Sequence, residues 1–129
     1  MTLAEVIAAL HAQLESVEGL RAVLDYEPAR VDVAPLVYLL VDSETREPRG
    51  NVIQCRYRVR ARLVLLWTDP QRAEGEMVGL FNAIPTALDA TAPRSYVADV
   101  DAGWATIGGI EYRVADFYTT VVTHEPALG

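Results

Sequence analysis

Four arginines alternate with apolar residues along one stretch of the chain, and their cationic groups could attract carboxylates or phosphates. They are Arg56, Arg58, Arg60 and Arg62. Residues two apart in a strand point to the same face, so this arrangement predicts a row of cations about 6.6 Å apart. Such a row could bind an acidic protein surface or the phosphates of a nucleic acid.

The surroundings of the row favour an acidic protein surface. The expected hairpin partner, residues 36–41, contains no acid, whereas the chain as a whole carries 18 acidic residues. We therefore predict that the row contacts a second copy of the chain; the alternatives are a solvated outer face of an antiparallel sheet or contact with nucleic-acid phosphate. A charged turn over residues 43–50 should belong to the same interface, with self-balancing charges around Pro48. Its charged residues are Glu44, Arg46, Glu47 and Arg49.

The remaining reactive side chains do not form a catalytic pattern. Cys55 falls on the apolar side of the arginine strand and is expected to act as a small hydrophobe. His11 and His124 are expected on the surface. Asp99 and Asp101 share one face of a strand and could hold a hard cation, but the spacing indicates no third ligand. We predict neither an enzyme nor a cofactor or metal site, while a small enzymatic or ligand-binding domain that uses Cys55, Asp99 and Asp101 remains the alternative.

Composition excludes several classes of protein. The chain has 129 residues, which predicts one domain over residues 1–129, and its net charge of −7 disfavours a general nucleic-acid binder. All 11 basic residues are arginine, so lysine-dependent Schiff-base chemistry is excluded. The single cysteine precludes an internal disulfide. The apolar run at residues 36–41 is too short to cross a membrane, and the first residues do not resemble a signal peptide, so we expect a protein made in a cytoplasm.

Periodicity predicts the elements that must position these residues. Apolar residues recur every three or four positions from Leu3 to Val17, which predicts a helix with a Thr2–Glu5 capping box and a stop at Gly19. Asp69 and Pro70 should begin a second helix, kinked or divided at Pro85. The predicted strands cover residues 20–24, 36–41, 53–67, 96–100, 104–107 and 110–123, with an irregular connector at 25–35 and a hairpin turn at 108–109.

The arginine strand is too long for a compact domain. Fifteen residues span about 50 Å, whereas a domain of this size is about 36 Å wide. We therefore predict that its arginine end and the charged turn project as an arm. The expected fold is α+β: a largely antiparallel or mixed sheet with a long protruding β-hairpin and two main helices packed on one side.

This layout resembles the tail terminator proteins of long-tailed bacteriophages, also called tail completion or tail-to-head joining proteins. The resemblance spans nearly the whole chain and depends on a pattern of elements. The segments that carry it are the helix at residues 3–14, Val23-Leu24-Asp25-Tyr26-Glu27-Pro28, Pro35-Leu36-Val37, the charged turn, residues 57–63, Thr68-Asp69-Pro70 with the helix through Leu88, and Tyr112-Arg113-Val114 to Val121-Val122.

The resemblance implies a structural virion protein without catalytic residues. By this resemblance, copies of the chain would form a homohexameric ring at the head-proximal end of the tail tube, stop tube polymerisation and join the tail to the head. The implied partners are further copies of the chain, the tail tube protein and a head connector or completion protein, with DNA passing through without specific binding. The closest alternative is another head–tail connector or head completion subunit.

Overall fold

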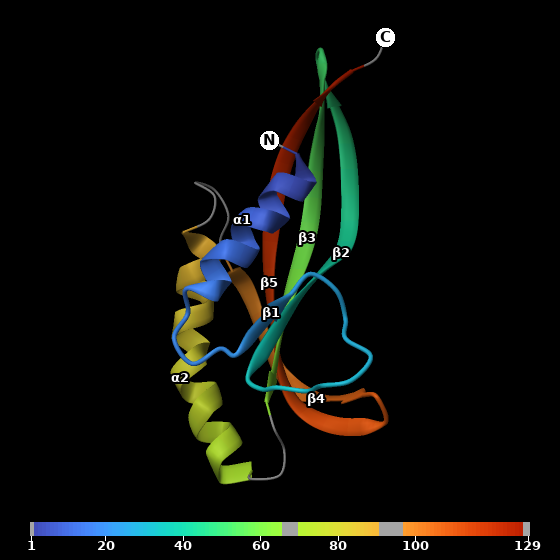
Figure 1. Ribbon diagram of the computed structural model, residues 1–129. Helices are drawn as coiled ribbons and strands as arrows, with labels where there is room; N and C mark the ends of the chain where they lie inside the picture. The colour runs from blue at the N-terminus through green and yellow to red at the C-terminus, as the bar shows by residue number, and fades with distance from the viewer. Residues whose placement is uncertain (1, 66–69, 91–96, 128–129) are drawn as a thin grey trace.

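The computed structural model describes residues 2–65, 70–90 and 97–127 (Figure 1). Within these residues the chain forms two helices and five strands. In chain order they are α1 (Leu3–Glu15), β1 (Ala22–Leu24), β2 (Leu36–Arg49), β3 (Val52–Leu65), α2 (Pro70–Asp89), β4 (Val97–Ile107) and β5 (Ile110–Pro126).

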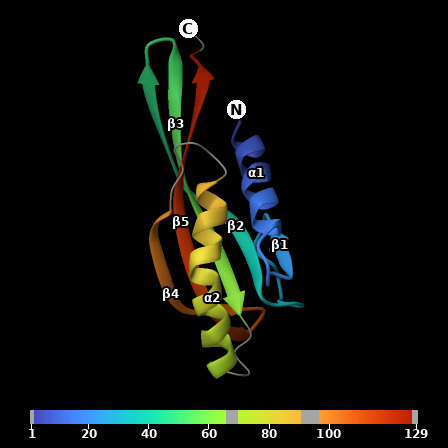
Figure 2. The same ribbon diagram turned by 90° about the vertical axis from the view of Figure 1, so that its left-hand side faces the viewer.

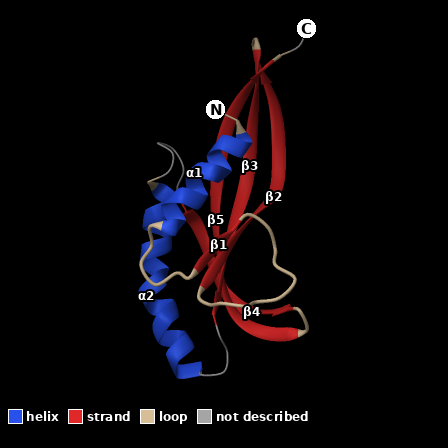
Figure 3. Ribbon diagram, in the orientation of Figure 1, coloured by secondary structure: helices blue, strands red, loops and turns tan. Residues whose placement is uncertain are grey.

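The five strands form one mixed sheet in the order β1-β2-β3-β5-β4. β1 is parallel to β2, and every other pair of neighbours is antiparallel. Both helices pack on the same face of this sheet (Figures 2 and 3). The α+β fold expected from the sequence, with a mixed sheet and two helices on one side, is therefore confirmed.

The alternating residues of β3 separate the two faces of the sheet. Cys55, Val59 and Leu63 are fully buried toward the helices. They pack against the apolar faces of α1 and α2. Residues three and four apart share one face of a helix, and alternate residues share one face of a strand, so each element presents one apolar face to the other. The helix residues that join this core are Val6, Leu10, Leu14, Ala73, Met77, Leu80, Ile84, Ala87 and Leu88.

The opposite face of the sheet is apolar only in the part near β1 and the β4–β5 turn. A second buried cluster lies there, and the irregular connector at residues 25–35 helps to cover it. The predicted turn at Gly108 and Gly109 is confirmed, since both residues have positive φ values of 60° and 81°. Gly108 also lies against the connector, because a Cβ atom there would be 2.6 Å from the Ala29 carbonyl oxygen. The cluster consists of Leu36, Tyr38, Val64, Ile107, Tyr112 and Val114.

The helix ends follow the sequence in part. The Thr2 side chain accepts a hydrogen bond from the Glu5 backbone N–H at 3.2 Å, which confirms the predicted N-cap of α1. The prediction that Pro85 could divide the second helix is wrong, because α2 is continuous through it. Ile84 and Leu88 on either side of Pro85 are fully buried, and their packing holds the helix together despite the missing backbone donor. Asp69, predicted to begin this helix, lies outside the described residues.

Three strands extend beyond the rest of the sheet as an arm. β1 pairs only with Leu36–Tyr38 of β2, and β4 pairs with β5 no further than Thr119. We define the arm as residues 42–60 and 120–126; its tip lies beyond the N-terminal end of α1 (Figure 1). The predicted projection of the hairpin is confirmed.

Three details of the strand prediction are corrected. Residues 43–49 were expected in a turn but belong to β2, and the turn itself is Gly50 and Asn51. The last strand was expected to end at residue 123 but pairs with β3 as far as Pro126, so the arm has three strands. The two strands expected at 96–100 and 104–107 form one strand, β4, since Asp101 to Gly103 keep the pairing with β5. Residues 66, 67 and 96, where the expected strands ended or began, lie outside the described residues.

Candidate functional site

The four arginines form a row on the helix-free face of β3, as the alternation predicted. Their partners on β5 in the strand register are Val122, Thr120, Tyr118 and Asp116, in the order from Arg56 to Arg62. The row therefore begins within the arm and ends over the body of the sheet. This difference in position gives the inner pair and the outer pair of arginines different surroundings.

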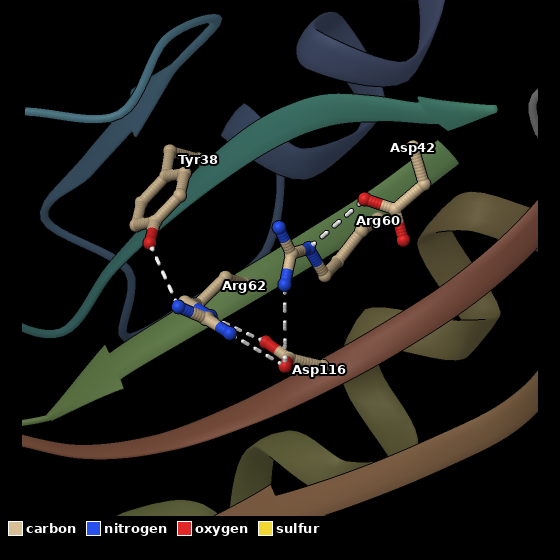
Figure 4. A network of polar contacts seen from close by, with 5 residues as sticks. All are labelled: Tyr38, Asp42, Arg60, Arg62 and Asp116. Carbon is tan, nitrogen blue, oxygen red and sulfur yellow. Dashed lines mark hydrogen bonds and ion pairs between the residues drawn. The ribbon is translucent and has the colours of Figure 1, made fainter. Parts of the chain in front are cut away.

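Arg62, at the inner end of the row, forms an ion pair with Asp116 of β5. Its Nε and Nη2 donate hydrogen bonds of 2.7 and 2.9 Å to the two carboxylate oxygens, and its Nη1 donates one of 3.3 Å to the Tyr38 hydroxyl (Figure 4). Asp116 is buried, and hydrogen bonding to it raises the pKa of Arg62 above its ordinary value. Burial also raises the pKa of Tyr38, although the Arg62 cation opposes this shift. The inner end of the row is thus internally neutralised.

Arg60 lies between two carboxylates of the same chain. Its Nε is 3.4 Å from Asp42 Oδ1, and its Nη1 is 3.9 Å from Asp116 Oδ2 (Figure 4). The contact with Asp42 lacks hydrogen-bond geometry, and Nε has no hydrogen-bond partner within the described part of the chain. Three members of this network, Arg60, Arg62 and Asp116, retain only 24%, 17% and 11% side-chain exposure.

These contacts correct the expectation that the row has no acids of its own to neutralise it. Asp42 directly follows the apolar segment that was taken as the hairpin partner, and β2 continues through it. Asp116 comes from β5, which the sequence did not place beside β3. Arg60 and Arg62 therefore contribute to the stability of the sheet and are not free to bind the acids of another molecule.

Arg56 and Arg58, at the outer end of the row, are exposed on the arm. The Arg58 guanidinium lies 4.1 Å from the centre of the Tyr118 ring, a cation–π contact that leaves its charge uncompensated. Neither arginine forms an ion pair with any residue that the structure describes. Val122, which pairs with Arg56 across the strands, is 40% exposed. The outer pair is thus the part of the row that a partner can reach.

The charged residues in the arm part of β2 mostly neutralise one another. Arg46 forms ion pairs with Glu44 at 3.0 Å and with Glu125 of β5 at 3.1 Å, and Arg49 pairs with Glu47 at 3.3 Å. The predicted self-balancing of this segment is therefore confirmed, with Glu125 as an added partner. Hydrogen bonds to the two glutamates raise the pKa of Arg46. Exposed pairs of this kind contribute little stability, but charged side chains and a proline protect a free strand edge from unwanted pairing.

The residues that an enzymatic alternative would use do not gather in one place. Cys55 is fully buried beneath the helices, whereas Asp99 and Asp101 are exposed on β4 and pair with residues of the opposite face. Within residues 2–65, 70–90 and 97–127, no group of three or more His, Cys, Asp or Glu side chains is arranged to hold a metal ion. None of the helices in these ranges is long and apolar enough to span a membrane.

The structure defines the surroundings of the two histidines. His11 is partly buried, and its ring nitrogens lie 2.7 Å from Asp25 and 3.2 Å from Glu15, so it links α1 to the connector. His124 is exposed, as expected, and pairs with Gln54 in the arm. Trp104 of β4 is 52% exposed, with the centre of its ring 5.5 Å from the Arg113 guanidinium.

Sequence reasoning missed the three residues that complete the network, Tyr38, Asp42 and Asp116. A signal for Asp116 was present, because a lone acid in the apolar run Val114 to Tyr118 must be paired if that run is buried. The position of Tyr38 gave no comparable signal, since its hydroxyl meets Arg62 only through the pairing of β2 with β3.

Comparisons with known proteins do not assign the chain to a family. No protein-family model matches it, and no curated protein matches it either.

Proposed function

We propose that this protein is a structural subunit of a ring that closes the head-proximal end of a bacteriophage tail tube, stops tube polymerisation and joins the tail to the head. The observation that carries the proposal is the three-stranded arm, which projects past the helices and presents Arg56 and Arg58 without ion-pair partners among the described residues. A projecting arm that exposes unpaired cations is suited to a subunit that reaches onto its neighbour.

The charge distribution supports contact between unlike surfaces. The arm, as defined above, holds five arginines and four acids, for a net charge of +1, and the rest of the chain holds six arginines and 14 acids, for a net charge of −8. Opposite charges favour contact of the arm of one copy with the body of the next, whereas two bodies repel each other. Such head-to-tail contacts generate rings when the rotation between subunits closes. An acidic ring would also let DNA pass without adhering to its wall.

A structural role is favoured over the enzymatic alternative by the placement of the candidate residues. The single cysteine is enclosed in the core, and the two aspartates of β4 lie on the other face of the sheet. A common active site would require both to face one space. A Cys55→Ser variant that assembles like the wild type but loses turnover of a substrate would favour the enzymatic alternative, whereas unchanged turnover would leave the cysteine without a catalytic role.

The test measures assembly and its effect on tail tubes. Native mass spectrometry over a range of protein and magnesium concentrations should detect a closed ring of six subunits. The ring should then bind the ends of tubes grown from tail tube protein and shorten them, as measured by electron microscopy. A ring that binds the head connector but leaves tube length unchanged would favour the alternative connector role. A chain that stays monomeric even in the presence of tubes would contradict both.

A further inference from the structure

We propose that the arm of one copy docks through Arg56 and Arg58 onto Asp99 and Asp101 of β4 in the next copy. This inference rests on the proposed ring, and it names the two surfaces whose contact would close it. The occupant of each surface is therefore a second copy of this chain.

The arm side of the contact is a cationic surface with an apolar residue beside it. Arg56 and Arg58 are two residues apart on one face of β3, and the exposed Val122 is the register partner of Arg56. No helix covers this face of the arm, because α1 and α2 both pack on the other side of the sheet (Figure 2). The surface thus combines two uncompensated charges with some apolar area.

The body side of the contact carries two carboxylates that lack cations. Asp99 and Asp101 are exposed on β4 and form no ion pair with any described residue. Asp101 lies directly opposite Asp116 in the strand register, and both oxygens of Asp116 already accept hydrogen bonds from Arg62. Arg62 is thus already bound to Asp116 and forms no ion pair with Asp101, so the Asp101 carboxylate remains available to a cation from another copy.

The two surfaces match in spacing as well as in charge. Each presents its charges on alternate residues of one strand, which places them about 6.6 Å apart on both sides. Within one chain they form no ion pair, because β5 lies between β3 and β4 and the Arg58 guanidinium lies over the ring of Tyr118, the register partner of Asp99. Both cations and both carboxylates are therefore free for a contact between copies.

A pair of charge-reversed variants tests this contact directly. The arm variant is Arg56→Glu with Arg58→Glu, and the body variant is Asp99→Arg with Asp101→Arg. Each variant alone should fail to assemble, since its contact surfaces then carry like charges. Mixed in equal amounts, the two should alternate around the ring, because reversed arms meet reversed bodies and native arms meet native bodies. Native mass spectrometry should then find rings with equal numbers of the two variants.

The control for the arm variant also reverses two arginines, Arg21→Glu with Arg30→Glu. Both are exposed on the body, away from the proposed contact. This control should form rings like the wild type. Circular dichroism and the urea midpoint of each variant should match those of the wild type, since all the substituted side chains are exposed. If a reversed variant does not fold, the neutral pairs Arg56→Gln with Arg58→Gln and Asp99→Asn with Asp101→Asn replace it, and each should raise the concentration for half-assembly at least tenfold.

The outcomes separate this inference from the proposed function. If the arm variant or the body variant alone forms rings like the wild type, the proposed contact is wrong and the ring proposal stands. The same conclusion follows if both variants fold but form no rings when mixed. An arm variant that still forms rings but no longer binds tube ends would assign the arm to the tube protein, which also overturns the inference. A wild-type chain that never forms a ring would overturn both.

Discussion

Replacement of Asp116 by Asn should cost about 2–3 kcal/mol of the free energy of unfolding. The substitution preserves shape but removes the carboxylate that hydrogen-bonds to Arg62 at 2.7 and 2.9 Å, and it leaves Arg60 with Asp42 alone among the acids of the described residues. Loss of one partner of a fully buried ion pair costs about 3–5 kcal/mol. We expect the smaller cost of about 2–3 kcal/mol for Asp116→Asn, because these side chains keep 11–24% exposure and Asp42 still lies beside Arg60.

The assay is urea unfolding at neutral pH, followed by circular dichroism and extrapolated linearly to water. Arg62→Met should cost less than Asp116→Asn, because Asp116 keeps the Arg60 cation 3.9 Å away. The double variant Arg62→Met with Asp116→Leu should recover most of the loss, since no buried charge is left without a partner. Arg56→Gln is the control and should stay within about 0.5 kcal/mol of the wild type. An Asp116→Asn variant as stable as this control would refute the structural role assigned to the inner arginines.

Three further predictions concern the body of the protein. Burial raises the pKa of Tyr38, so the folded state retains the hydroxyl proton at a pH where the unfolded chain has lost it. The free energy of unfolding should therefore fall above about pH 10. Urea unfolding between about pH 8 and 11 should show a smaller fall for Tyr38→Phe. Gly108→Ala should destabilise by about 2 kcal/mol or more, because its Cβ would lie 2.6 Å from the Ala29 oxygen, whereas Gly109→Ala meets only the backbone strain of its positive φ and should cost about 1 kcal/mol by thermal unfolding. Thr2→Ala should remove the N-cap of α1 at a cost of about 1 kcal/mol in the same assay, and an unchanged melting temperature would contradict that role.

The architecture follows from local patterns that the sequence displays. The strict alternation in β3 predicted both of its faces, and the length of that strand predicted the arm, because each depends only on the geometry of one strand. The N-cap at Thr2 and the turn at Gly108 were likewise local and are confirmed. Hydrophobic periodicity and turn chemistry thus sufficed for the helices and for most of the sheet.

The details that the sequence did not predict depend on which strands lie side by side. β5 pairs with β3 along the whole of β3, so Asp116 meets Arg62 and residues 120–126 join the arm. Residues 43–49 look like a polar turn, but pairing with β3 keeps them extended. The pairing of distant segments cannot be predicted from either segment alone, and this pairing determines whether a charge is neutralised within the chain.

The four arginines of β3 show how one sequence pattern serves two purposes. They share a residue type, a spacing and a face, yet Arg62 and Arg60 lie where β2 and β5 supply carboxylates, while Arg58 and Arg56 lie where β5 supplies Tyr118, Thr120 and Val122. The inner pair therefore stabilises the base from which the arm projects, and the outer pair keeps its charge for a partner. A partner that bound the whole row would have to break the Arg62–Asp116 ion pair, whereas one that binds Arg56 and Arg58 leaves the sheet intact. The exposed end of the row is for this reason the end at which assembly should occur.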